Sequence, residues 1–155
     1  MIDTSCPSVV DLRRTIETHI LGLYEADGTT LRSEATWPGK YTLPNGTSIP
    51  AVYTVGAQMV PSDWTIQGIE CVIDDVPEPV NNGIGSVISI ETWPVRFTNY
   101  GTSKGTTMGS SLLDIQRRLA RTFPRDQVTY MARTEATYEA LTARIRGAVL
   151  NPPIP

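Results

Sequence analysis

The sequence predicts an α+β fold in which a mainly antiparallel β-sheet packs with two α-helices, one N-terminal and one after the long central strands. Apolar residues recur at helical spacing in two places, and the runs between them are rich in β-forming residues. The chain of 155 residues has the size of one domain, and its apolar content of 40% and charged content of 19% are low for a compact globule. Thr, Ser, Gly and Pro make up the difference, as in proteins rich in strands and loops. We therefore expect one domain over residues 1–150 and an extended Pro-rich tail over 151–155, available to lie on a neighbour.

The first expected element is a helix over about residues 7–24. Pro7 suits its first turn, and Ser8 with Asp11 resembles a capping box. The apolar stripe consists of Val9, Leu12, Ile16, His19/Ile20 and Leu23. Asp27-Gly28 should end this part of the chain.

Three strand-forming runs follow, over residues 39–55, 66–73 and 86–98. Asn45-Gly46 lies between β-prone residues and predicts a hairpin turn. Proline lacks an N–H, so Pro50 should begin its strand or lie at a sheet edge, and Pro94 should mark a bend, a bulge or an edge. The segments 74–83 and 99–109 are expected to be exposed loops, the second of them mobile.

A second helix is expected from Ser110 or Ser111 to about Thr122, with Pro124 as its stop. Its buried stripe is formed by Leu112, Ile115, Leu119 and Phe123. Residues 127–131 indicate a strand. Residues 137–150 fit either a helix or a strand, and Gly147 with the Thr content favours the strand.

Residues suited to catalysis are scarce. The one histidine, His19, lies on the apolar stripe of the first helix, so we expect it to be buried or at an interface. Cys6 and Cys71 have no metal or redox spacing and are expected to be free thiols. Trp37, Trp64 and Trp93 could fill the edge of a core or an interface. We expect no enzyme, no catalytic residue, no bound metal and no cofactor; the role indicated is binding to other protein chains.

Charge is segregated along the chain, whose net charge is −3. Residues 41–95 hold six acidic and no basic residues, whereas residues 96–155 hold nine basic and four acidic ones. This net charge argues against a simple nucleic-acid binder. The candidate protein-interface residues are Asp74, Asp75, Glu78, Lys104, Arg117, Arg118, Arg121 and Arg125. The arginines could form a solvated or salt-bridged surface, or contact an acidic partner or nearby DNA.

An enzymatic alternative remains open. Glu70, Asp74, Asp75 and Glu78 form the densest carboxylate group, and such oxygens bind Mg²⁺ or Ca²⁺. The group lacks the spacing of a calcium loop, so a solvated acidic loop is favoured. The alternative is a small metal-dependent hydrolase or nuclease that uses Glu70, Asp74 and Asp75.

The order of elements resembles that of the tail terminator and related head–tail completion (neck) proteins of tailed bacteriophages. The resemblance rests on the segments 9–17, 49–55, 88–97 and 112–123, in that order along the chain. It implies a virion structural protein, assembled in the host cytoplasm, that forms a ring, commonly a hexamer, on the tail tube. Such a ring stops tube growth and joins the tail to the head-completion or connector protein.

The resemblance also implies that the ring contacts the sheath terminus where the tail is contractile, and that DNA passes through its lumen without sequence-specific contact. No membrane partner is expected, because no apolar run approaches the length that spans a bilayer and no signal peptide is recognised. Other possibilities are a different neck or baseplate component and a non-viral adaptor domain.

Overall fold

The computed structural model describes residues 9–55, 60–74, 78–79, 88–101, 112–123, 128–134 and 139–150. Its helical elements are α1 (Val9–Thr15), the π-helix η1 (Ile16–Ile20), the 3₁₀-helix η2 (Glu34–Thr36) and α2 (Leu112–Thr122). Its strands are β1 (Gly39–Thr42), β2 (Ser48–Pro50), β3 (Val52–Val55), β4 (Thr65–Asp74), β5 (Glu78–Pro79), β6 (Ile88–Asn99), β7 (Val128–Thr134) and β8 (Glu139–Leu150). The predicted α+β fold is confirmed: six antiparallel strands in the order β2-β1-β4-β6-β8-β7 accompany one N-terminal helix and one helix after the central strands.

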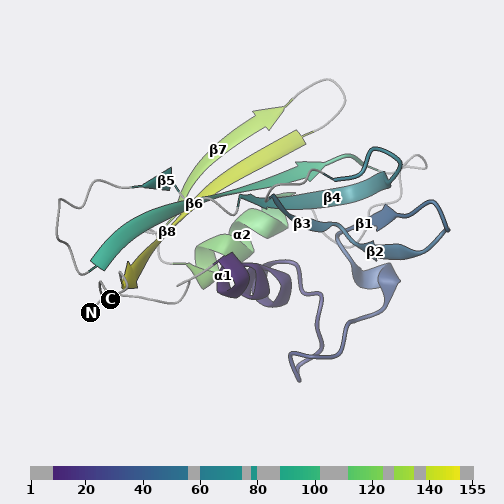
Figure 1. Ribbon diagram of the computed structural model, residues 1–155, viewed down its shortest axis with the longest axis horizontal. Coiled ribbons are helices and arrows are strands. Elements are labelled where there is room, and N and C mark those ends of the chain that lie inside the picture. Colours follow the sequence, from purple (N-terminus) through teal and green to yellow (C-terminus); the bar gives the residue numbers. More distant parts are fainter. Residues whose placement is uncertain are drawn as a thin grey trace, which may run out of the picture.

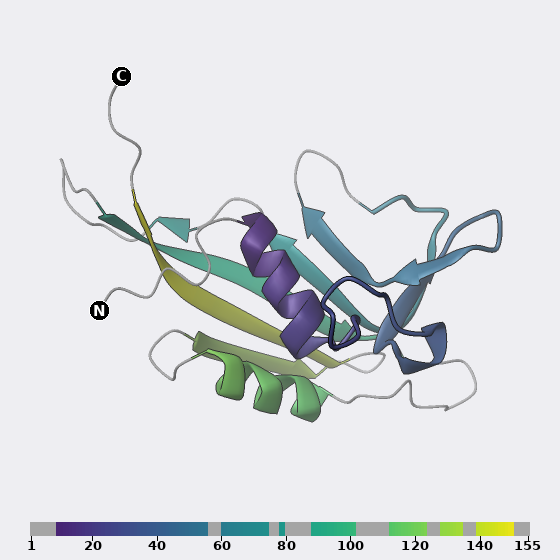
Figure 2. The same ribbon diagram turned by 90° about the horizontal axis from the view of Figure 1, so that it is seen from below.

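The core lies between the sheet and the helices, since α1 and α2 cover the same face of the sheet (Figures 1 and 2). Side chains of β6 alternate in the way this arrangement requires: Trp93, Val95 and Phe97 are buried, whereas Arg96 is exposed on the other face. The helices contribute Leu12, Ile16, Ile20, Ile115 and Leu119, all fully buried. An antiparallel sheet can leave one face to solvent, and the described helices leave the far face uncovered.

The N-terminal helix ends at Ile20, earlier than predicted, and its last turn is a π turn in which Leu21 N–H donates to Ile16 O at 2.9 Å. Gly22 then adopts a φ of +62°, which glycine tolerates and which turns the chain out of the helix. The extra residue in the π turn changes the angular position of His19, which is exposed. The prediction of a buried His19 is therefore wrong. A contact of this side chain with another protein stays a prediction.

The predicted hairpin at Asn45-Gly46 is confirmed, because β1 and β2 pair around it with Thr42 opposite Ser48. Pro50 ends β2, the outermost strand on that side, as the edge prediction requires. Residues 39–55 form three strands rather than one hairpin, since β3 leaves β2 and pairs parallel with β4. Ala51 marks the change of partner, and its N–H donates to Gly39 O at 3.1 Å.

Pro94 lies inside β6 without a bulge on the β8 side, where the register is continuous through the Pro94–Arg144 pair. On its other side, pairing with β4 ends at Val95 and pairing with β5 begins at Thr92. Pro94 therefore occupies a local edge between two partner strands, a position in which a missing N–H is tolerated. Of the predicted alternatives, the edge is the one observed.

The C-terminal part of the chain confirms the strand interpretation, because β8 pairs with β6 from Glu139 to Leu150. The expected loop over 74–83 is interrupted, since Glu78–Pro79 pair with β6 as β5. Most of the expected loop over 99–109 and the tail over 151–155 lie outside the described residues. None of the described helices is long and apolar enough to span a membrane.

Trp37 and Trp93 belong to the core cluster, so of the two predicted positions, the core or an interface, the core is the one observed for these tryptophans. Trp64 is half-buried, with its ring centroid 5.5 Å from that of Tyr41.

Candidate interaction surfaces

The solvent face of α2 carries two of the predicted interface arginines. Arg117 and Arg121 are both exposed and lie one turn apart, so they share a helix face with Leu113 one turn earlier. Leu113 is 53% exposed, whereas Ile115 and Leu119 of the same helix are fully buried in the core. We call Leu113, Arg117 and Arg121 the α2 surface.

Arg118 has a different role from its two neighbours. Its Nη1 donates a hydrogen bond of 2.9 Å to the carbonyl oxygen of Ile20, the last residue of η1. Carbonyl groups at a helix C-terminus lack intrahelical partners and favour a nearby cation. Arg118 therefore joins α2 to the end of the N-terminal helix, a structural role that the charge pattern did not predict.

The acidic candidates lie elsewhere. Asp74 ends β4 and lines a shallow cavity of about 250 Å³ on the sheet face that the helices leave uncovered. The other lining residues are Val55, Val72, Pro94, Arg96 and Thr142. Glu78 is described only as part of the backbone of β5, and Asp75, Lys104 and Arg125 lie outside the described residues. Asp74 and the α2 surface are thus on opposite faces of the sheet and are not brought together.

Glu70 is not part of an open acidic site. Its side chain is only 5% exposed, and its Oε2 accepts a hydrogen bond of 2.8 Å from the Tyr41 hydroxyl. Burial, with the neighbouring Glu70 carboxylate as a second cause, raises the pKa of Tyr41 well above its usual range. Asp74 lies four positions after Glu70 on the same strand, roughly 13 Å away at the usual rise. Among the residues described, no three His, Cys, Asp or Glu side chains gather closely enough to hold a metal ion.

Cys71 is a free thiol, as predicted, and it is fully buried in the core cluster. Burial raises the pKa of its thiol far above the ordinary value, because a thiolate would lose its hydration there. Such a group is a poor nucleophile in the folded protein.

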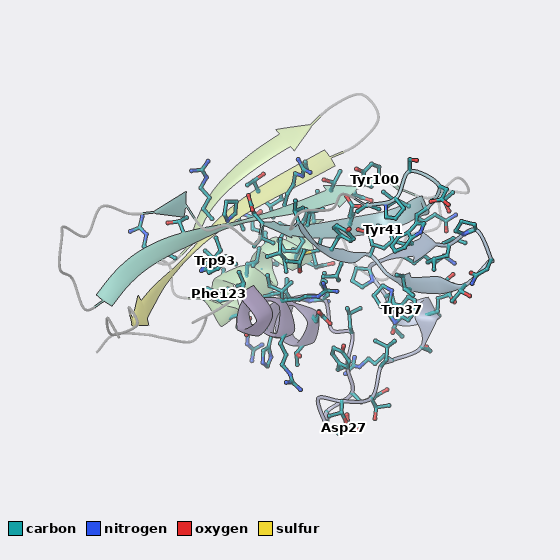
Figure 3. The ribbon with its side chains drawn as sticks, in the orientation of Figure 1. Asp27, Trp37, Tyr41, Trp93, Tyr100 and Phe123 are labelled. Atoms are coloured by element: carbon teal, nitrogen blue, oxygen red, sulfur yellow. The ribbon has the colours of Figure 1, made fainter. Side chains whose placement is uncertain are left out.

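An acidic loop that is not among the predicted candidates projects between η1 and β1 (Figure 3). Glu25, Asp27 and Glu34 are exposed on it, and Leu31 is 44% exposed beside them. Glu25 pairs with Arg32 at 3.8 Å, and Glu34 pairs with Lys40 at 2.6 Å. We call Glu25, Asp27, Leu31 and Glu34 the acidic loop surface.

Asp27 organises the tip of this loop. Its Oδ1 accepts hydrogen bonds from the backbone N–H groups of Thr29 and Thr30, both at 2.9 Å, and its Oδ2 accepts one from the Thr30 hydroxyl. These hydrogen bonds, that of the Thr30 side chain first, lower the pKa of Asp27 to about 2. Asp-Gly-Thr-Thr is a sequence typical of an Asx turn, a signal distinct from the helix stop that Asp27-Gly28 predicts.

A cavity of about 350 Å³ separates this loop from α1. It is lined by Arg13, Arg14, Glu17, Tyr24, Gly28 and Thr29. The guanidinium of Arg13 is engaged in structure: it bonds Glu17 at 2.7 Å, Thr54 Oγ1 at 3.1 Å and Val52 O at 3.3 Å. Arg13 therefore connects α1 to β3.

Three exposed arginines occupy the uncovered sheet face. Arg96 on β6 and Arg144 and Arg146 on β8 are exposed, and the register places Arg96 opposite Thr142 and Arg144 opposite Pro94. These residues were not among the predicted candidates, because their face could be assigned only once the strand register was known.

Comparison of the chain with known proteins gave no match: no protein-family model matches it, and no curated protein or solved structure resembles it significantly.

Proposed function

We propose that the chain is a structural subunit of a tailed-bacteriophage virion, a tail terminator that forms a ring at the top of the tail tube. The observation that carries the proposal is the arrangement of elements. An N-terminal helix and a helix after the long strands pack on the same face of one antiparallel sheet, in the order that the phage resemblance implies. The ring stops growth of the tube and joins the tail to the head-completion or connector protein.

The distribution of surface charge supports assembly into a ring. A ring forms when one patch of a subunit meets a different patch of the next, so the two patches must be complementary rather than identical. The α2 surface is basic, and the loop that carries the acidic loop surface stays net negative after the ion pairs of Glu25 with Arg32 and of Glu34 with Lys40 are counted. The two surfaces belong to different parts of the molecule. A subunit with two unlike exposed patches suits a head-to-tail contact.

The partners that follow from this function are further copies of the chain, the tail tube protein and the head-completion or connector protein. In a contractile tail, the sheath terminus is a further partner. DNA passes through the lumen without sequence-specific contact. The protein is assembled in the host cytoplasm and resides in the neck of the virion.

The other functions draw less support from the described residues. A different neck or baseplate position is compatible with the same fold and surfaces. The metal-dependent hydrolase hypothesis is not favoured, because Glu70 is buried and bonded to Tyr41 and is far from Asp74 along β4.

The test is the length of tail tubes. A candidate tail tube protein of the same phage is polymerised with and without an excess of the purified chain, and the tubes are imaged by negative-stain electron microscopy. A terminator leaves shorter tubes with a ring of extra density at one end. Tubes of unchanged length with bare ends, together with a chain that does not sediment with them, would contradict the proposal.

A further inference from the structure

The α2 surface has the composition of a protein contact rather than of a solvated helix face. Its two arginines follow Leu113 by one and two turns of the helix, and Leu113 is one of the large apolar side chains that the described part of the protein leaves exposed. Arg118, between them in sequence, is bonded to Ile20 and holds the helix in place. The surface is therefore an apolar side chain beside two cations on a helix that is fixed to the body of the protein.

The acidic loop surface has the complementary composition. Leu31 is exposed on the same loop as Glu25, Asp27 and Glu34. These three carboxylates exceed by one the cations Arg32 and Lys40, which pair with Glu25 and Glu34, so the loop has a net negative charge. The backbone hydrogen bonds to Asp27 hold the loop tip in one conformation, and the low pKa of Asp27 keeps it ionised at any pH near neutrality. A loop already ordered loses little conformational entropy when it binds.

The two surfaces cannot meet within one molecule, since the loop tip with Asp27 projects away from α2 (Figures 1 and 3). We propose that the α2 surface of one copy binds the acidic loop surface of a second copy, with Leu113 against Leu31 and the arginines against the acidic residues. This inference rests on the proposed function, because it names the head-to-tail contact that closes the ring. The contact is heterologous, so each copy uses both surfaces at once.

A second copy fits the α2 surface better than a nucleic acid does. Polyanion binding needs a broad basic area, whereas this surface holds two exposed arginines and one exposed leucine in a row along the helix. The acidic loop surface supplies both the opposite charge and the apolar counterpart.

The test uses charge reversal in the full chain, with self-association measured by sedimentation velocity over a concentration series at low and high salt. Arg117→Glu with Arg121→Glu makes the α2 surface acidic. Glu25→Lys with Glu34→Lys makes the loop basic and keeps the residues of the Asp27 turn, but it also removes the ion-pair partners of Arg32 and Lys40. Each double variant should weaken association by about a hundredfold or more, because like charges then face each other. Wild-type association should weaken at high salt.

Mixing the two double variants provides the decisive measurement. In an assembly that alternates the two variants, the acidic α2 surface of one variant meets the basic loop of the other. At the next contact the unchanged basic α2 surface meets the unchanged acidic loop. Opposite charges face each other at both contacts, so association should return. The matched control is Arg96→Glu with Arg146→Glu, which makes the same change of charge on the uncovered sheet face and should leave association unchanged. Leu113→Ala should weaken association by about tenfold without changing the charge.

The proposal is overturned if the wild-type chain stays monomeric, if the control variant weakens association as much as the α2 variant does, or if the mixture fails to associate. Loss of binding to a DNA duplex by the α2 variant, with self-association intact, would instead assign the surface to a polyanion. Tube length measured with the same variants separates this inference from the proposed function. If the α2 double variant still caps tubes, the proposed terminator function stands and the proposed contact through Arg117 and Arg121 is wrong. If the chain associates through these residues but does not cap tubes, the contact stands and the terminator function is wrong.

Discussion

The Tyr41 hydroxyl donates a hydrogen bond of 2.8 Å to Oε2 of Glu70, joining β1 to β4 through two buried side chains. A buried carboxyl group that loses its donor retains the cost of its desolvation. Tyr41→Phe removes only the hydroxyl, so we expect it to lower the free energy of unfolding by about 2 kcal/mol or more.

Urea denaturation of Tyr41→Phe, Glu70→Gln and the double variant measures this coupling. Glu70→Gln keeps an acceptor for the tyrosine and removes the charge, so Tyr41→Phe should cost less in the Gln background than in the wild type. Equal costs in the two backgrounds would show that the charge of Glu70 adds nothing to the hydrogen bond with Tyr41.

The buried thiol of Cys71 should make the protein less stable in mild alkali. Its pKa is raised in the folded protein by burial, whereas in the unfolded chain it titrates near its ordinary value of about 8.5. Above that pH the unfolded state binds fewer protons than the folded state, so the free energy of unfolding falls as pH rises, by at most about 1.4 kcal/mol per pH unit. The raised pKa of Tyr41 adds a further loss above about pH 10.

Denaturation between about pH 8 and 9.5 separates the contribution of the thiol from other groups. Cys71→Ala lowers stability at every pH because it removes a core side chain, but its stability should change less steeply with pH. Cys6→Ser is the control that changes the other thiol. If Cys71→Ala and the wild type show the same slope, the thiol does not cause the alkaline loss.

Periodicity predicted most elements because it reports which face of an element is buried. The stripes through Ile16 and Ile115 and the β-prone run through Val95 all face the core, as predicted. The π turn escaped prediction because Ile16 and Ile20 are buried whether the turn is α or π, and only the exposed His19 reveals the difference. The parallel pairing of β3 could not be predicted either, since a β-prone run does not specify its partner strand.

The candidate surfaces could be predicted only in part. The α2 stripe correctly placed Arg117 and Arg121 on the solvent face, because they lie away from Ile115 and Leu119. The bond from Arg118 to Ile20 joins residues 98 apart in the chain, so no local pattern could show it. The acidic loop is hard to recognise in the sequence because its three carboxylates are spread over ten residues, with the basic residue Arg32 among them.

Adjacent arginines on α2 should differ sharply when replaced. Arg118→Ala removes the bond to the Ile20 carbonyl and leaves the C-terminus of η1 without this partner, so we expect a loss of about 1 kcal/mol in the free energy of unfolding. Arg117→Ala makes the same substitution on the same helix, so the change in helix propensity is equal, but the Arg117 side chain is exposed. It should change the free energy of unfolding by less than about 0.5 kcal/mol. Thermal denaturation of both variants, at a protein concentration low enough to keep the chain monomeric, makes the comparison. Equal effects would mean that the bond to Ile20 adds no stability.

Gly39 is the position where a single methyl group should be least tolerated. A Cβ built on it lies 2.1 Å from the carbonyl oxygen of Ile69 and 2.7 Å from its nitrogen, and these are backbone atoms of a central strand that cannot move aside as a side chain can. The close approach brings β1 against β4 where Ala51 N–H donates to Gly39 O and Ile69 N–H donates to Pro38 O. Gly39→Ala must separate these strands, so we expect a loss of about 3 kcal/mol or more, or failure to fold.

Gly28→Ala is the matched control for Gly39→Ala. Gly28 has a φ of +72° and nothing within 4 Å of its added Cβ, so the substitution carries only the cost of a left-handed alanine, about 1 kcal/mol. Soluble expression and urea denaturation of the two variants compare a steric clash with a purely conformational cost. If Gly39→Ala is no more destabilising than Gly28→Ala, β1 and β4 are not packed as closely as their backbone contacts indicate. If the difference is as large as expected, the hairpin of β1 and β2 and the start of β3 depend on the absence of a side chain at residue 39.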